Sequence, residues 1–228
     1  MTRLITHKVT WGAFVLWTLC TPSTSLTAGA ANAATVPVTT GRFTPLETCN
    51  RLPGAAAFRT ALAAAVRQRN AAALVALASP NVKLDFGDGS GAAELRQRLA
   101  GAEGRKLWRE LDRIVPLGCA VQQGNLAIPS MFTHDFRALD PFDIMVVTGV
   151  RVPLRATAGP AARPLRLLSW TVVTPLSGDD SAKPYRRVRL GRQTGYVEAA
   201  KLRSPLDYRM IVSRGWGGWK IDAFLAGD

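Results

Sequence analysis

The 228-residue sequence predicts an α+β protein: a helix-rich N-terminal region, then a small β-barrel, and a β-hairpin at the C-terminus. Apolar residues recur at helical spacing up to residue 115, whereas from residue 143 the apolar runs are short and rich in β-branched residues. A glycine-rich stretch near the end separates two further strand-like runs. Helices followed by a run of strands indicate the α+β class rather than an alternating α/β fold.

The first 33 residues are typical of a cleaved secretion signal. Arg3 and Lys8 give a basic start, the apolar run Trp11–Cys20 follows, and Ala31-Asn32-Ala33 places small residues before a cleavage site. That apolar run is too short to cross, as a helix, a hydrocarbon layer of about 30 Å. We therefore expect residues 1–33 to be removed and the protein to be periplasmic or secreted. A short anchor that is never removed is the alternative.

Charge and cysteine content narrow the class further. The chain carries a formal charge of +13, and loss of Arg3 and Lys8 with the signal leaves +11. The two cysteines that remain, Cys49 and Cys119, are an even pair in an oxidising compartment and predict a disulfide. The alternative is a catalytic Cys119 acting with His134, which lacks a family signature and requires Cys49 to be unpaired.

Residues 34–142 are expected to form the helix-rich N-terminal domain, with an extended lead up to residue 53. Asn70 is expected to cap a second short helix that runs through Ala78 and is ended by Pro80, and Ser90 is expected to cap a third. Alternating apolar and polar residues at 82–86 predict a half-buried strand between them. The apolar faces of the first and fourth helices are Phe58, Ala61, Leu62, Ala65 and Val66, and Leu107, Trp108, Leu111, Ile114 and Val115.

Residues 143–203 have the pattern of a small barrel, and residues 204–228 that of a terminal hairpin. The hairpin strands flank the turn Gly215-Trp216-Gly217-Gly218. The strands are expected at 144–147, 151–154, 165–173, 185–190, 194–197, 208–213 and 219–225.

One stretch, Gly87–Ala92, has the G-x-G-x-x-A spacing of a dinucleotide-binding loop. Asp88 would place a carboxylate where pyrophosphate must approach backbone N–H groups, and no strand follows the next helix as a βαβ unit requires. The stretch also fails as a calcium loop, because Gly87 and Ser90 replace the residues needed at the third and sixth positions. We therefore expect a tight turn and no cofactor.

Catalytic motifs give no positive signal. The sequence contains no G-x-S-x-G, S-x-x-K or H-E-x-x-H motif, and a single histidine after cleavage cannot build the usual zinc hydrolase site. Asp135, Asp140 and Asp143 are close in sequence, but a solvated loop near Pro141 explains them. We expect a protein that is not an enzyme and binds no metal.

The basic charge is concentrated in residues 143–203, where eleven basic and four acidic residues supply +7 of the expected +11. Such a module outside the cytoplasm would attract anionic polymers or surfaces, although a solvated face is the alternative. Trp216, at a glycine-rich tip, is a further candidate contact residue. The candidate ligand-binding residues are Tyr185, Arg187, Arg189, Arg192, Tyr196 and Trp216.

Part of this region resembles bacterial SH3 domains. Val150-Arg-Val-Pro-Leu-Arg155 is similar to their opening V-x-V-R strand, and Leu165–Val173 to their middle strands. Tyr185-Arg-Arg-Val188 stands where the family has W-x-x-V, and Thr194-Gly-Tyr-Val197 resembles its closing G-Y/W-V strand. The resemblance implies an SH3-like barrel that binds cell-wall peptides or proteins, although Tyr185 replaces the usual tryptophan.

The register of the strand at 185–190 stays open at this point. Alternate residues share a face, so Tyr185, Arg187 and Arg189 point one way. If Tyr185 followed the family's tryptophan into the core, a bulge would be needed nearby.

The flanks of this module are similar to NTF2-like domains. Phe58 through Phe86 resembles the start of such a cone, and Trp219 through Asp228 its last strand. The resemblance implies that 54–142 and 204–228 form one discontinuous domain, which the SH3-like module interrupts.

We expect a non-catalytic binding protein of the cell envelope whose partner is peptidoglycan or an envelope protein, with anionic surfaces as a further possibility. We expect no nucleic-acid partner and no transmembrane span in the mature chain. The alternative function is an envelope hydrolase that uses carboxylates in a pocket between the two halves. Two facing acids in a pocket would favour the enzyme, and a shallow groove of aromatic residues and arginines would favour the binding protein.

Overall fold

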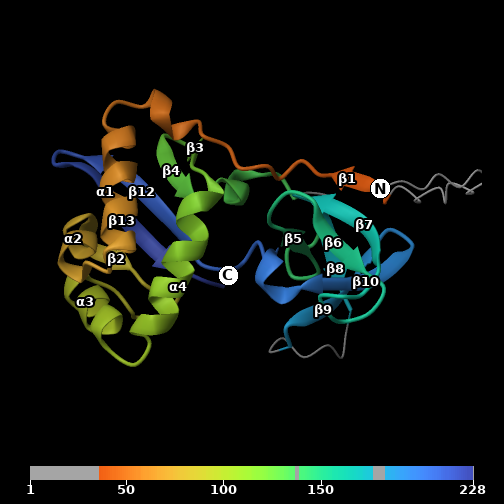
Figure 1. Ribbon diagram of the computed structural model, residues 1–228. Helices are drawn as coiled ribbons and strands as arrows, with labels where there is room; N and C mark the ends of the chain where they lie inside the picture. The colour runs from red at the N-terminus through yellow and green to blue at the C-terminus, as the bar shows by residue number, and fades with distance from the viewer. Residues whose placement is uncertain (1–35, 137–138, 177–182, 228) are drawn as a thin grey trace, which may run out of the picture. The chain divides into compact units, whose positions relative to one another are not determined.

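The computed structural model describes residues 36–136, 139–176 and 183–227, so the predicted signal at 1–33 lies outside the described residues. The described chain contains both α-helices and two large β-sheets (Figure 1), which confirms the predicted α+β class. No helix of the described part is both long and apolar enough to cross a membrane.

The α-helices all precede residue 115, as predicted. They are α1 (Ala55–Arg67), α2 (Ala71–Ala76), α3 (Ala92–Ala100) and α4 (Gly104–Ile114). The predicted cap at the start of α2 is confirmed, because the Asn70 side chain accepts a hydrogen bond from the Ala73 amide at 2.9 Å. The predicted apolar stripe of α4 is also confirmed, since Leu107, Trp108 and Leu111 are buried.

The first sheet has five strands in the order β2-β13-β12-β4-β3. Its strands are β2 (Ala78–Lys83), β3 (Ala120–Gln122), β4 (Asn125–Ile128), β12 (Arg209–Gly215) and β13 (Gly218–Leu225). The C-terminal hairpin β12–β13 thus lies in the middle of a sheet whose other strands come from the N-terminal half. Figure 1 shows these strands beside α1 to α4.

Three local predictions in this half are wrong. Pro80 does not follow a helix but lies within β2, where the position at the sheet edge tolerates a proline. The strand therefore begins earlier than predicted, and Phe86 lies beyond it with 55% of its surface exposed. The residue that caps α3 is Gly91 at a φ of 102°, a conformation that glycine adopts readily, and not Ser90.

The second sheet has eight strands in the order β1-β7-β6-β10-β9-β8-β5-β11. Its strands are β1 (Val38–Thr40), β5 (Met145–Val147), β6 (Val152–Arg155), β7 (Pro164–Ser169), β8 (Val172–Pro175), β9 (Tyr185–Leu190), β10 (Gln193–Glu198) and β11 (Leu202–Arg203). In this order β1 and β11 are the two edge strands and do not pair with each other, so a closed small barrel is not confirmed.

Two features of the second sheet differ from the prediction. The expected single strand at 165–173 is divided into β7 and β8, because Trp170 between them has a φ of 51° and turns the chain. The N-terminal segment at 34–53, for which no strand was predicted, contains strand β1, and β1 pairs in parallel with β7. Short 3-10 helices complete the elements: η1 (Cys49–Arg51), η2 (Val115–Leu117), η3 (Ser130–Thr133) and η4 (Ala199–Lys201).

Buried side chains form separate cores. A large core between the helices and the five-stranded sheet includes Leu111 and Ile221. The eight-stranded sheet has its own core around Leu154 and Val188, and a smaller cluster gathers around Phe43. The five-stranded sheet therefore buries its side chains in one large core with the helices, and the eight-stranded sheet buries side chains in two smaller clusters.

Candidate functional site

Three neighbouring strands, β6, β10 and β9, carry most of the residues that the sequence singles out for binding. Tyr196 on β10 lies directly opposite Arg187 on β9 and opposite Arg155 on β6. Arg189 lies one pair further along β9, opposite Thr194. Cross-strand partners have Cβ atoms about 4.5–5.5 Å apart, so the tyrosine lies between two guanidinium-bearing side chains on one side of the sheet. We call Arg155, Arg187, Arg189 and Tyr196 the arginine–tyrosine face.

The opposite side of these strands packs into the protein core, and this determines which side chains point inward and which point outward. Val188 and Val197 have no exposed surface. Because side chains alternate along a strand, Tyr185 shares the outer side with Arg187, and Arg186 shares the inner side with Val188. Tyr185 therefore does not take the inward place of the SH3 family's tryptophan.

The residues of the arginine–tyrosine face and its neighbours are spread along the hairpin. Arg192 is exposed in the turn between β9 and β10. It lies six residues before Glu198, which pairs with Tyr185 at the open end of the hairpin. At about 3.3 Å per residue the hairpin measures roughly 20 Å, so the predicted residues lie along a strip and do not converge on one point. At one side of the strip, the Arg155 guanidinium donates to the Ala162 carbonyl at 2.8 Å, which fixes its position.

Trp216 belongs to a different part of the fold. It lies at the tip of the β12–β13 hairpin, in the five-stranded sheet, and its side chain is fully exposed at 110%. The structure therefore does not bring Trp216 into the strip formed by the other predicted residues. Its neighbour Trp219 is buried and donates its indole N–H to the Pro53 carbonyl at 3.0 Å.

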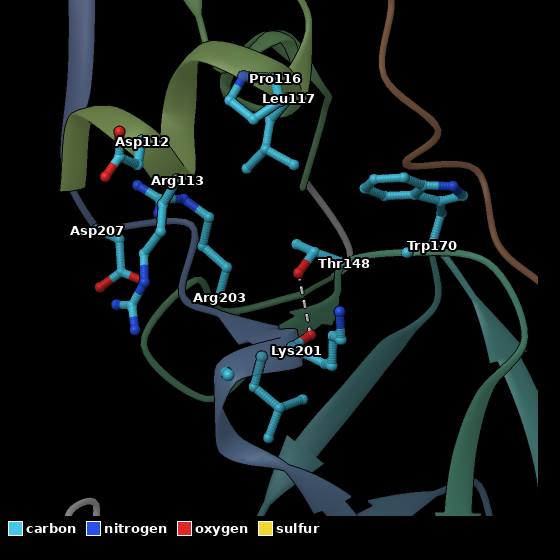
Figure 2. Close-up of a pocket in the computed structure, with 12 residues that line it drawn as sticks. Asp112, Arg113, Pro116, Leu117, Thr148, Trp170, Lys201, Arg203 and Asp207 are labelled. Carbon is cyan, nitrogen blue, oxygen red and sulfur yellow. Dashed lines mark hydrogen bonds between the residues drawn. The ribbon is translucent and has the colours of Figure 1, made fainter. Parts of the chain in front are cut away.

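A pocket whose lining residues the sequence did not single out lies at the ends of α4, β7 and η4. Its volume is about 200 Å³. Its lining residues are Asp112, Arg113, Pro116, Leu117, Thr148, Gly149, Trp170, Ala200, Lys201, Leu202, Arg203 and Asp207. In Figure 2, Trp170 faces Asp112 and Arg113 across the opening, with Leu117 on one side and Thr148 on the other. We call this the Trp170 pocket.

One wall of the Trp170 pocket is a network of charges. Glu110 accepts from Arg113 at 2.9 Å and forms an ion pair with Arg203 at 3.7 Å. Arg203 is 5% exposed and also donates to the Tyr208 carbonyl. Burial lowers the pKa of the Arg203 guanidinium from its ordinary value, and the nearby Asp207 and Glu110 carboxylates oppose that change.

The two acids that line the pocket already have partners. Asp112 receives two hydrogen bonds from Arg69, one of them at 2.8 Å. Asp207 accepts the Ser204 backbone N–H at 3.0 Å and holds the turn before β12. Both carboxylates that line the pocket are therefore engaged in contacts within the protein.

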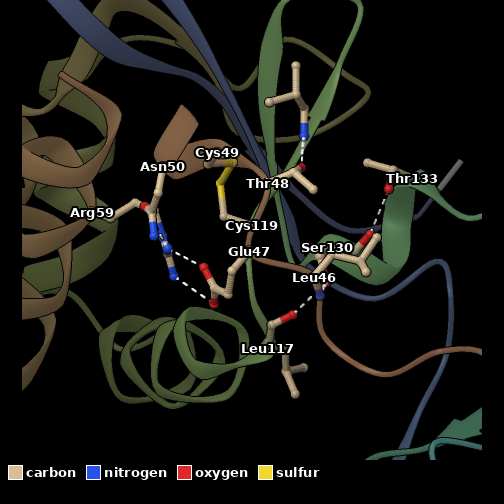
Figure 3. Close-up of a disulfide and its surroundings, with 11 residues drawn as sticks. Leu46, Glu47, Thr48, Cys49, Asn50, Arg59, Leu117, Cys119, Ser130 and Thr133 are labelled. Atoms are coloured by element: carbon tan, nitrogen blue, oxygen red, sulfur yellow. Dashed lines mark hydrogen bonds and ion pairs between the residues drawn. A yellow bond between two sulfur atoms is a disulfide. The ribbon is translucent and has the colours of Figure 1, made fainter. Parts of the chain in front are cut away.

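The predicted disulfide is confirmed. Cys49 and Cys119 are bonded with their Cα atoms 5.6 Å apart (Figure 3), so the alternative of a catalytic Cys119 is wrong. The Cys119 amide donates to the Leu46 carbonyl at 2.8 Å, and the Thr48 amide donates to the Cys119 carbonyl at 3.0 Å. Beside them, Glu47 forms an ion pair with Arg59. The cross-link therefore ties the segment before α1 to the start of β3.

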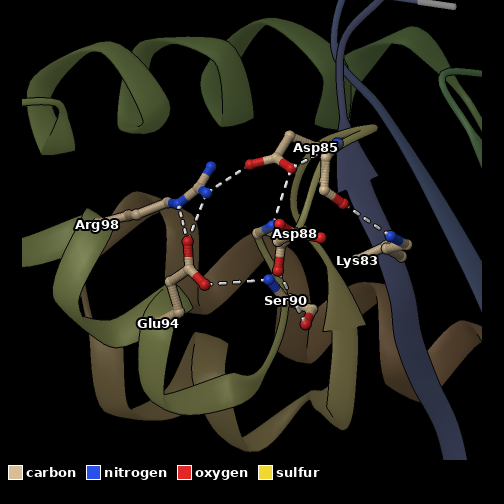
Figure 4. A network of polar contacts seen from close by, with 8 residues as sticks. Lys83, Asp85, Asp88, Ser90, Glu94 and Arg98 are labelled. Atoms are coloured by element: carbon tan, nitrogen blue, oxygen red, sulfur yellow. Dashed lines mark hydrogen bonds and ion pairs between the residues drawn. The ribbon is translucent and has the colours of Figure 1, made fainter.

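The glycine-rich stretch at 87–92 is a tight turn that Asp85 organises (Figure 4). One Asp85 oxygen accepts the Gly87 and Gly89 amides at 2.9 and 3.0 Å, and the other accepts from Arg98 at 2.5 Å. Arg98 and these amides hold the pKa of the Asp85 carboxyl below its usual range. Because a carboxylate already occupies these N–H groups, the turn has no place for a pyrophosphate there.

No group of three or more histidine, cysteine, aspartate or glutamate side chains within 36–136, 139–176 and 183–227 is arranged to hold a metal ion. Nothing in these segments therefore identifies a metal centre among the residues that line the face or the pocket.

The sequence singled out three residues of the arginine–tyrosine face, Arg187, Arg189 and Tyr196, but not Arg155, and it did not single out the residues of the Trp170 pocket. Trp170 lies in the middle of a run predicted to be one strand, and no feature of the sequence marks its left-handed backbone. Lys201 and Arg203 belong to the eleven basic residues of 143–203, but their position beside α4 depends on tertiary contacts.

Comparison with known proteins adds little to this picture. No protein-family model and no curated protein matches the chain. Among solved structures, a designed NTF2-like protein matches at 14% sequence identity, covering 76% of this chain and 96% of its own, with a TM-score of 0.26. A TM-score this low shows neither a shared fold nor a shared function.

Proposed function

We propose that this chain is an exported, non-catalytic binding protein of the cell envelope that holds an anionic polymer, peptidoglycan, along the arginine–tyrosine face. The observation that carries the proposal is the register of three adjacent strands, which puts Tyr196 between Arg155 and Arg187 on the outer side of a sheet. An aromatic ring between guanidinium groups offers a flat surface for a sugar ring and charge for a carboxylate.

The charge of the strip suits such a ligand. Arg189 and Arg192 are exposed, and Arg187 is exposed beside Tyr196. Peptidoglycan is long and carries carboxylates on its peptide stems, so a strip of roughly 20 Å would meet several of its groups at once. A shallow strip of this kind binds an extended polymer better than a small molecule, which needs a concave site.

The proposal includes a division of the chain into two domains. Residues 143–203 are taken as an SH3-like module, and 34–142 and 204–228 as two parts of one NTF2-like domain. This reading is supported by the likeness of the sequence motifs. It is also consistent with β12 and β13 lying between β2 and β4 in the five-stranded sheet.

The alternative function, an envelope hydrolase, has weaker support. It needs two free carboxylates, and the candidates in the Trp170 pocket are Asp112 and Asp207. Asp112 is paired with Arg69, and Asp207 holds a backbone turn. Carboxylate oxygens that already accept these hydrogen bonds are less available to a substrate.

The test is retention of the purified protein on insoluble peptidoglycan across a salt series. The variant replaces Arg187, Arg189 and Arg192 together by glutamine. If each exposed arginine contributes about 0.5 kcal/mol, the triple variant binds about tenfold more weakly at low salt. The difference should shrink as salt rises, because exposed charges are screened within about 8 Å at physiological ionic strength.

A matched control removes the same charge from the helices. Arg67, Arg105 and Arg109 are exposed on α1 and α4, and their replacement by glutamine should leave retention unchanged. Circular dichroism verifies that both variants are folded. Equal retention of wild type and both variants at every salt concentration would show that the strip is only a solvated face. Release of soluble fragments from peptidoglycan by the wild type would favour the hydrolase instead.

A further inference from the structure

We propose that the Trp170 pocket is a second binding site, for a small organic anion that carries a carboxylate or phosphate next to an apolar or flat body. This site does not depend on the arginine–tyrosine face or on peptidoglycan binding. Three observations lead to it: the backbone that positions Trp170, the hydrogen-bonding groups left available in the pocket, and its apolar walls.

The backbone around Trp170 has an uncommon conformation that surrounding contacts hold in place. Trp170 has a φ of 51°, which a bulky residue seldom adopts unless its surroundings impose it. Its amide donates to the Gly149 carbonyl at 3.2 Å, and its carbonyl accepts the Phe43 amide at 3.4 Å. Gly41 lies so close that a Cβ there would come within 2.2 Å of the Trp170 carbonyl oxygen, so the approach requires glycine. Segments far apart in sequence thus combine to present the indole to the pocket.

The carboxylates of the pocket already have partners, whereas its lysine does not. Asp112 and Asp207 accept hydrogen bonds from Arg69 and from the Ser204 amide. By contrast, no residue of the described chain accepts a hydrogen bond from the exposed Lys201 ammonium.

Arg113 adds further donors to this set. One of its terminal nitrogens donates to Glu110, and its side chain is 56% exposed, so its remaining N–H groups face solvent. Exposed donors on Arg113 and Lys201, beside two carboxylates that already have partners, are complementary to a ligand rich in acceptors. Charge-assisted hydrogen bonds from lysine and arginine make an anionic acceptor the best match.

The remaining walls limit the rest of the ligand. Pro116 and Leu117 face the pocket from η2, and the Trp170 indole adds a flat apolar surface. With a volume of about 200 Å³, the pocket admits a body the size of one or two amino-acid residues and not a folded protein segment. Carboxylate and phosphate ligands share this recognition chemistry, so the experiment includes one probe of each kind.

The experiment uses the ¹⁵N-labelled protein and follows the indole N–H signals by nuclear magnetic resonance. The carboxylate probe is N-acetylalanine, the phosphate probe is methyl phosphate, and the neutral probe is N-acetylalaninamide. We expect a saturable shift of the Trp170 signal with at least one anionic probe and none with the neutral amide. The Trp216 signal, from a side chain outside the pocket, should not move. Comparison of the two anionic probes then shows which kind of anion the pocket prefers.

Two variants separate a real site from a general effect of charge. Lys201→Met removes an exposed ammonium in the pocket and should weaken binding about tenfold or more, the usual effect of losing a hydrogen bond to a charged group. Lys106→Met removes an exposed ammonium from α4 outside the pocket lining and should leave the affinity unchanged. Equal weakening by both variants, an equal response to the neutral amide, or no saturation with either anion would overturn the proposal.

Discussion

Removing the disulfide should lower the stability of this protein by an amount that follows from its topology. Cys49 and Cys119 are separated by 70 residues and are both fully buried. In the chain-entropy treatment, a cross-link that closes a loop of this length restricts the unfolded chain enough to stabilise the folded state by about 4 kcal/mol. Replacing both cysteines by alanine should therefore reduce the free energy of unfolding by about that much.

The native structure around the cross-link should survive its loss. The Cys119 amide still donates to the Leu46 carbonyl, and the Thr48 amide still donates to the Cys119 carbonyl, because backbone groups make both bonds. For a protein of this size, a loss of about 4 kcal/mol corresponds to a decrease of about 8–16 °C in the melting temperature.

The assay is urea denaturation followed by circular dichroism, on the wild type with and without reductant and on the double alanine variant. The variant should match the reduced wild type and should not respond to reductant. The unfolding free energy of the variant should fall more steeply with urea concentration than that of the cross-linked wild type, because the unfolded chain without the cross-link is more expanded. A loss of less than about 1 kcal/mol would contradict the entropic reasoning, since loop closure alone accounts for several times that.

Three further predictions follow from other parts of the fold. Trp216→Ala should change the free energy of unfolding by no more than about 0.5 kcal/mol, because the side chain makes no buried contact, and a larger loss in urea denaturation would show a contact that the structure lacks. Burial, and to a smaller extent the Arg42 charge, lowers the pKa of His134, so the unfolded chain binds a proton more readily. Stability should therefore be fully present above about pH 6.5 and fall as the pH drops through the folded pKa. His134→Phe should flatten this part of a pH series of urea denaturation, and an unchanged pH dependence would refute the role of His134. Asp85→Asn weakens the acceptor at the turn, so the Gly87 and Gly89 amides should exchange hydrogen faster, and unchanged protection of both would show that another group holds them.

Local sequence signals predicted the elements whose structure depends on near neighbours. The cap of α2 and the apolar stripe of α4 belong to this group: the Asn70 side chain accepts from an amide three residues away, and the spacing that buries Leu107 and Leu111 is set by one helical turn. The strand β9 was predicted at its observed limits, because alternation around Val188 is a property of the strand itself.

Other elements could not be predicted in this way because distant parts of the chain decide them. Pro80 normally signals the end of an element, yet it lies in β2 because that strand occupies a sheet edge. The division between β7 and β8 occurs at Trp170, where contacts from Phe43 and Gly149 hold a conformation that tryptophan does not favour. Local preference would have continued the strand.

The placement of the candidate binding residues was likewise predictable only in part. Composition and alternation were enough to place Tyr185, Arg187 and Arg189 on one side of a strand, since a strand alternates whatever surrounds it. Only the sheet register shows that Tyr196 lies between Arg187 and Arg155, because pairing joins residues that no local pattern connects.

By itself, the sequence determined the α+β class, the positions of the helices, the disulfide between Cys49 and Cys119, and the sided distribution of basic residues along β9. These features depend on spacing along the chain or on simple arithmetic of residue types. The tertiary structure alone decided the strand order β2-β13-β12-β4-β3 of the sheet that the C-terminal hairpin enters, and that Trp170, Lys201 and Arg113 line one pocket. The physical reason is that burial of apolar surface is not directional, so it selects which distant segments meet only when the whole core is assembled.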